Sequence, residues 1–304
     1  MEISIDSLVD KHKDQKAFVV CHGPSLQPFI EKVSTLQKSG DLLRFELNNW
    51  FDYFSHSPNY WLIANGELNV QDCINNSGVW QARKYPTQLI NNTDMTLLFA
   101  DSVDLSDIQF VRENLKPDFL SYDQRHFKNH SCLQIMKNFK AHYKEKGNLD
   151  FIDYGNNSVM FQPPRLKSGA GFSGALPTGP TGKGKCCARR QDDRQTIQEA
   201  LQKVSGYSEH YSTSDTGALH MISFAILMGT NPVYVAGLDL DYRLGYANPK
   251  VPVPYHNTDW QKFDLNLRND LRIINESAKA RGIKIINLNL DSWYDEFEKG
   301  EFVE

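Results

Sequence analysis

Short β-rich segments alternate with helix-length segments along this chain of 304 residues. The β-rich segments are residues 16–20, 44–48, 60–64, 96–100, 232–236 and 283–288. Apolar residues at helical spacing occupy 26–36, 216–228 and 267–280. Because such alternation builds a parallel sheet, the sequence predicts an α/β, Rossmann-like, mainly parallel sheet with helices on both faces. We expect a single domain over residues 1–304.

Residues 162–190 interrupt this alternation. Prolines and repeated glycines predict a flexible Gly/Pro-rich loop insertion there. Within it, Gly179–Cys186 matches G-x-x-x-x-G-K, but Cys186 stands where a P-loop carries the Ser or Thr that holds Mg²⁺. No strand precedes it, so we interpret the segment as a basic loop. A second loop, at about 242–260, is expected to act as a lid.

The composition restricts the class of protein. The net charge of −4 gives no basic field for nucleic acid. Five scattered cysteines form neither a zinc spacing nor a disulfide framework, which favours a reducing cytoplasm. The sequence has no signal core and no run long enough to span a membrane, although peripheral membrane contact stays compatible with it. A homo-oligomer is expected, without cofactor or metal.

Two segments predict contacts to a phosphate. Gly23, Pro24 and Ser25 come directly after a strand and before a helix, and Thr216 and Gly217 begin the second helix. Unpaired N–H groups at helix starts suit phosphate oxygens, and Gly23 permits close approach of a ligand. Each segment is equally compatible with an ordinary turn or helix cap.

Polar residues follow three of the predicted strands. Asn48 and Asn65 each end a strand, where ligands of open α/β sheets bind, and a carboxamide suits ribose hydroxyls or a base edge. Asp239 follows Gly237 after a later strand and could bind a hydroxyl or a metal. The alternatives are turn chemistry for the asparagines and a structural role for Asp239.

Three further side chains could act in catalysis. Tyr242 and Tyr246 lie just beyond Asp239, and their phenols can donate to a leaving phosphate. His256 lies in a polar loop and can serve as a general base. The alternatives are surface packing for the two tyrosines and a surface position without function for His256.

Taken in order, these segments resemble a bacterial group of glycosyltransferases that contains the family 42 sialyltransferases and, more distantly, the motility accessory factor proteins. The features that carry the resemblance are a G-P-S-L turn, two strands ending in Asn, a hydroxyl-Gly helix start, G-[IL]-D, two tyrosines and a loop histidine. They match Gly23-Pro24-Ser25-Leu26, Asn48, Asn65, Thr216-Gly217, Gly237-Leu238-Asp239, Tyr242, Tyr246 and His256. The ordered set spans about residues 16–290. Asp215 departs from the family serine, and the stretch between Tyr246 and His256 is shorter than the usual lid.

The resemblance implies a variant of the GT-A fold and transfer of a sialic-acid-like (nonulosonic) sugar from a CMP-activated donor to a glycan or protein hydroxyl. It implies no metal, leaving-group stabilisation by Tyr242 and Tyr246, and deprotonation of the acceptor by His256. The implied nucleotide contacts are Gly23, Pro24, Ser25, Asn48, Asn65, Thr216, Gly217 and Asp239.

Two other functions stay open at this point. A pterin-type pyrophosphokinase shares the G-P-S-L and G-x-D features, and it would need Mg²⁺, ATP and acidic residues such as Asp239 and Asp241. A nucleotide-sugar-binding module without catalysis would keep the same binding residues and lack a working base.

Overall fold

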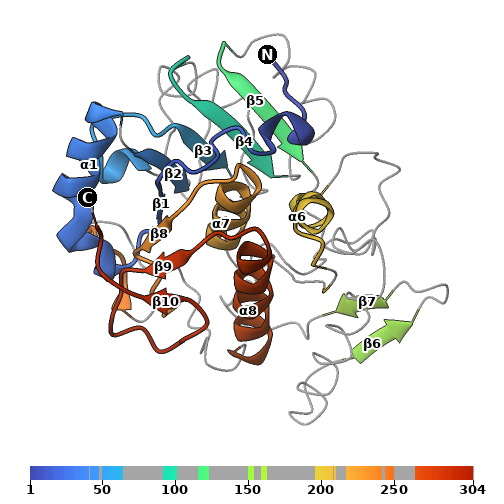
Figure 1. The fold of residues 1–304 in the computed structure, drawn as a ribbon. Helices are drawn as coiled ribbons and strands as arrows, with labels where there is room; N and C mark the ends of the chain where they lie inside the picture. The colour runs from blue at the N-terminus through green and yellow to red at the C-terminus, as the bar shows by residue number, and fades with distance from the viewer. Residues whose placement is uncertain are drawn as a thin grey trace.

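The structure is a computed structural model that describes residues 1–40, 42–47, 50–63, 92–100, 116–122, 150–153, 159–162, 196–207, 209, 217–241, 244–249 and 264–303. An eight-stranded sheet forms its centre, in the order β10-β9-β8-β1-β2-β3-β4-β5 (Figure 1). Neighbouring strands of this sheet are all parallel, so the predicted parallel α/β sheet is confirmed. The strands are β1 (Ala17–Val20), β2 (Leu43–Leu47), β3 (Tyr60–Ile63), β4 (Thr96–Ala100), β5 (Asp118–Tyr122), β8 (Val233–Ala236), β9 (Ile285–Asn287) and β10 (Glu298–Lys299).

Helices cover both faces of the sheet, as predicted. The described helices are η1 (Ile5–Leu8), η2 (Pro24–Phe29), α1 (Ile30–Ser39), η3 (Trp50–Asp52), α6 (Ile197–Ser205), α7 (Gly217–Leu227) and α8 (Asp264–Ala280). Along β1, Ala17 and Val19 face the core that contains α6, α7 and α8, whereas Phe18 and Val20 face the core that contains α1. Burial on both faces explains why β1 is apolar at every position.

Helix α7 is apolar around its whole circumference. All residues from Ala218 to Leu227 are buried, His220 and Ser223 included. A helix of this kind needs cover on every side. The sheet provides it through β1, β2 and β8, while α6 and α8 pack beside α7, as Figure 1 shows.

The structure differs from the sequence-based prediction in several elements. The helix predicted at 26–36 begins as the 3-10 helix η2 and becomes α-helical only at Ile30, because Pro28 lies inside the first turns and has no N–H to donate. Strand β5 was not predicted, nor was a separate antiparallel pair formed by β6 (Asp150–Asp153) and β7 (Val159–Gln162).

Two predicted segments fall largely outside the described residues. The insertion at 162–190 is described only at Gln162, and the lid loop at 242–260 only at 244–249. Their order and roles therefore stay predictions. In the part of the chain that the structure describes, no helix is both long enough and apolar enough to span a membrane.

Candidate functional site

The strand order changes direction at β1. The chain passes from β1 to its neighbour β2 on one side, and it returns much later, through α7, to β8 on the other side. Ligands of open α/β sheets bind at the carboxyl edge beside such a switch point. In this chain the turn Cys21–Ser25 leaves β1 there, and Gly237–Asp239 leaves β8.

The β1 and β8 turns are bound directly to each other. The Gly23 N–H donates to the Gly237 carbonyl at 2.9 Å, and the Ser25 N–H donates to Asp239 Oδ2 at 3.0 Å. A Cβ on Gly23 would lie 2.2 Å from that same Asp239 oxygen. Gly237 has φ +72°, and a Cβ there would lie 2.0 Å from the Cys21 carbonyl oxygen. Both positions therefore require glycine.

These contacts change how the Gly23–Leu26 turn can bind a ligand. We expected free N–H groups, but Gly23 and Ser25 donate across to β8, and the Leu26 N–H donates to the Gly23 carbonyl at 3.0 Å. Pro24, which begins η2, has no N–H. The Ser25 hydroxyl is different, because Oγ is buried and has no hydrogen-bond partner among the described residues. It stays available to a ligand.

Asp239 links the carboxyl ends of three strands. Its side chain is nearly buried, with 6% of the residue exposed. Oδ2 accepts from Ser25 after β1, and Oδ1 accepts from Asn289 Nδ2 after β9 at 2.7 Å. The next residue, Leu240, has φ 52° and packs against the core. This geometry supports the structural interpretation of Asp239.

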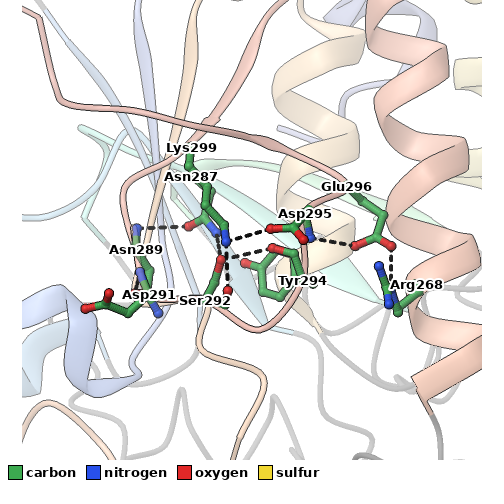
Figure 2. Close-up of polar contacts among 9 residues, drawn as sticks. All are labelled: Arg268, Asn287, Asn289, Asp291, Ser292, Tyr294, Asp295, Glu296 and Lys299. Atoms are coloured by element: carbon green, nitrogen blue, oxygen red, sulfur yellow. Dashed lines mark hydrogen bonds and ion pairs between the residues drawn. The ribbon is translucent and has the colours of Figure 1, made fainter.

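Asn289, which binds Asp239, belongs to a hydrogen-bonded segment after β9, and Figure 2 shows the contacts within that segment. The Asn289 N–H donates to Asn287 Oδ1 at 3.1 Å, and Asn287 Nδ2 donates to Ser292 Oγ at 2.9 Å. Tyr294 completes the support, because its hydroxyl donates to the Leu238 carbonyl at 2.7 Å. The carboxyl-edge turns are thus fixed by side chains from the last part of the chain.

Tyr246 lies in a segment that contacts the β1 turn. The Ala247 N–H donates to the His22 carbonyl at 2.8 Å, and Asn248 Nδ2 donates to the Asp52 carbonyl at 3.3 Å. The structure therefore brings the Tyr246 segment to the turn that contains Gly23.

Gly217 begins helix α7. The helix ends at Leu227, close before the amino end of β8, so over a length of about 16 Å it runs back from the carboxyl edge. This connection directs the Gly217 end of α7 toward the edge where Gly23 lies.

A charged cluster that the sequence did not reveal lies beside the β1 turn. We call Arg44, Glu46 and His22 the buried array. His22 Nε2 is 3.3 Å from Glu46 Oε2, and Arg44 Nε is 3.4 Å from Glu46 Oε1. The side chains of Arg44 and Glu46 are 0% exposed.

The array is electrostatically costly. Burial raises the pKa of Glu46, opposed by the hydrogen bond from His22 and by Arg44. Burial also lowers the pKa of Arg44 to about 10. The Arg44 guanidinium lies 4.3 Å from the Phe54 ring centroid and donates through Nη2 to the His56 carbonyl.

The remaining candidate residues lie outside the described part of the chain and stay predictions. They are Asn48, Asn65, Thr216, Tyr242 and His256. Among the described residues, no group of three or more His, Cys, Asp or Glu side chains could hold a metal ion.

A partly open cavity of about 200 Å³ lies at the opposite, amino edge of the sheet. Its lining includes the first residues of β2, β3, β4 and β5, namely Leu43, Tyr60, Thr96 and Asp118. His12 also lines it, and its Nε2 is 2.6 Å from the Tyr60 hydroxyl. Burial, together with Lys11, lowers the pKa of His12. This cavity is separate from the carboxyl-edge turns.

No family model matches the sequence, and no curated protein matches it. The chain is similar to the solved sialyltransferase CstII from Campylobacter jejuni in complex with the substrate analogue cytidine-5'-monophosphate, at 12% identity and a TM-score of 0.39, covering 96% of this chain and 89% of that one. CstII with the substrate analogue CMP-3FNeuAc gives 12% identity and a TM-score of 0.41, covering 95% and 89%. An alpha-2,3-sialyltransferase from Campylobacter jejuni in apo form is 11% identical with a TM-score of 0.36, and the match covers 99% of this chain and 88% of that one.

Proposed function

We propose that this chain is a sialyltransferase-like glycosyltransferase. It moves a nonulosonic sugar from a CMP-activated donor to an acceptor hydroxyl without a metal ion. One observation carries the proposal: the Gly23 turn, Asp239 and the Tyr246 segment, which are distant in sequence, are hydrogen-bonded together at the carboxyl edge beside the switch point. The same segments carry the family resemblance in the sequence.

In this proposal the nucleotide lies across the carboxyl ends of the strands. Ser25 contributes its free hydroxyl, and Gly23 lets the β1 turn lie close against Asp239. Pro24 starts the helix that follows, and Asp239 holds the turn in place. Asn48, Asn65, Thr216 and Gly217 complete the proposed nucleotide contacts.

The proposed chemistry needs little from the protein beyond positioning and charge stabilisation. The bond between the anomeric carbon and the phosphate oxygen breaks, and CMP leaves with the bonding electrons. Tyr242 and Tyr246 donate hydrogen bonds to the phosphate as its charge increases. His256 takes the proton from the acceptor hydroxyl, which then forms the new bond to the anomeric carbon.

The structure bears on the pyrophosphokinase alternative through Asp239. Both carboxylate oxygens of Asp239 already accept hydrogen bonds, from Ser25 and from Asn289. These two bonds join the turns that follow β1 and β9 to the β8 turn, which gives Asp239 a structural role that needs no metal. We therefore favour the transferase.

The test is product release from two substrates. With CMP-sialic acid in the presence of a chelator, we expect free CMP to accumulate, slowly with water as acceptor and faster with a glycan acceptor. With ATP and Mg²⁺, we expect no AMP. Metal-dependent AMP release would establish the pyrophosphokinase instead, and ligand-induced stabilisation without turnover of either substrate would establish the binding module.

Asn48→Ala should weaken CMP binding by about 1–3 kcal/mol, since a ligand polar group would lose its buried partner. Calorimetric titration of CMP into the variant and the native protein measures this. The control is Asn269→Ala, because Asn269 is exposed and lies on helix α8. Unchanged affinity in Asn48→Ala would place the nucleotide elsewhere.

A further inference from the structure

The buried array lies on one side of the β1–β2 pair, from Arg44 near the amino end of β2 to Glu46 near its carboxyl end. Phe18 pairs in register with Arg44, and Val20 pairs with Glu46. His22 follows Val20 by two residues and reaches Glu46 from the end of β1. The array therefore extends along β2 to the Cys21–Ser25 turn at the switch point.

Stability is a poor explanation for this array. Arg44 and Glu46 are buried completely, and removing such charges from water generally costs more than their attraction returns. Their hydrogen bonds are also incomplete: among the described residues, Arg44 Nε, Arg44 Nη1 and Glu46 Oε1 have no hydrogen-bond partner. Charged groups kept buried at such cost are typical of functional sites.

His22 is the member of the array that can reach a ligand. Its side chain is 10% exposed, whereas those of Arg44 and Glu46 are 0% exposed. His22 Nε2 is hydrogen-bonded to Glu46, and the Tyr53 ring lies against the imidazole with ring centroids 4.4 Å apart. With Glu46 ionised, Nε2 carries a proton and donates to it, which fixes the orientation of the ring. No described residue bonds to Nδ1.

A phosphate is the ligand group that fits this arrangement. The N–H groups of Gly23, Ser25 and Leu26 are already paired, so these three groups are not available to an anion. A protonated imidazole donates through both ring nitrogens, so His22, with Nε2 bonded to Glu46, can donate to a ligand through Nδ1. Such a charge-assisted hydrogen bond to a phosphate oxygen is among the stronger polar contacts in proteins.

We propose that His22 binds the phosphate of the nucleotide donor, and that Glu46 and Arg44 are positioning residues that orient it. This inference rests on the proposed function, because it assigns a residue to the donor of that reaction. The Ser25 hydroxyl, on the same turn, is a second donor to the same phosphate.

The test compares CMP with cytidine, which differs only by the phosphate. For His22→Gln we expect about tenfold weaker CMP binding, from the loss of one charge-assisted hydrogen bond, and unchanged cytidine binding. Glutamine keeps a donor for Glu46, so the variant should fold. His12→Gln is the matched control, because His12 lies at the opposite edge, and its affinities should equal those of the native protein. In labelled native protein, CMP should shift the His22 ring nitrogen resonances, and cytidine should not.

Each outcome decides the proposal. If His22→Gln keeps the native ratio of CMP to cytidine affinity, His22 does not bind phosphate. The array then serves only to pack Trp50 of η3 against β2. If native protein binds neither compound, the proposed function fails, and inorganic pyrophosphate then decides the inference. If pyrophosphate shifts the His22 resonances, His22 belongs to a phosphate site with another function. If the resonances do not move, the assignment of His22 to a phosphate is overturned. Glu46→Gln should also weaken CMP binding by about threefold, because the charge that orients His22 is lost.

Discussion

Glu46→Ala is expected to lower the free energy of unfolding by about 3–5 kcal/mol, because removal of one partner leaves a buried charge without compensation. The charge in question is that of Arg44, which is 0% exposed and pairs with Glu46 at 3.4 Å. Urea denaturation measures the change through the transition midpoint, with an unchanged slope.

Two controls separate this effect from simple loss of an ion pair. Glu209→Ala removes the partner of Arg272, and because both side chains are about half exposed, stability should change little. The double variant Arg44→Met/Glu46→Leu removes both buried charges and should recover most of the loss. A single variant as stable as Glu209→Ala, or a double variant as unstable as Glu46→Ala, would contradict our description of the array.

His256→Ala is expected to lower turnover at least tenfold while donor affinity changes little, because general bases typically contribute at least a hundredfold to the rate. Steady-state kinetics with CMP-sialic acid and a glycan acceptor gives the turnover, and CMP titration gives the affinity. His12→Gln, a histidine change at the amino edge, should keep native turnover. Native turnover in His256→Ala would remove this residue from the mechanism.

The parallel sheet was predictable because most of its strands are short β-rich runs separated by helix-length segments. β1 is the clearest case, since the same run that reads as a buried strand pairs with β2 and β8. β5 was missed because Asp118 and Ser121 leave it only a short apolar run, and no sequence pattern indicates that this run pairs with the predicted strand at 96–100.

The site was only partly predictable. The sequence indicated that Gly23, Asp239 and Tyr246 belong near one edge, and the described contacts join their segments. The sequence did not indicate that the Ser25 N–H would donate to Asp239, because that contact depends on how closely two turns distant in sequence approach each other.

The buried array was missed for a related reason. Alternating charged and apolar residues in 44–47 are typical of a strand with one solvent-facing side. Trp50 and Phe54 cover that side instead, so Arg44 and Glu46 are buried. Such cover comes from tertiary packing and cannot be read from the strand itself.

The most direct measurement is a thermal-shift series with CMP, CDP, UDP, GDP, ATP and CMP-sialic acid, each with and without Mg²⁺. Our account predicts that the cytidine compounds alone raise the melting temperature and do so equally well in a chelator, because a ligand that binds only the folded state stabilises it. Stabilisation by ATP that depends on Mg²⁺, with no response to CMP, would contradict it.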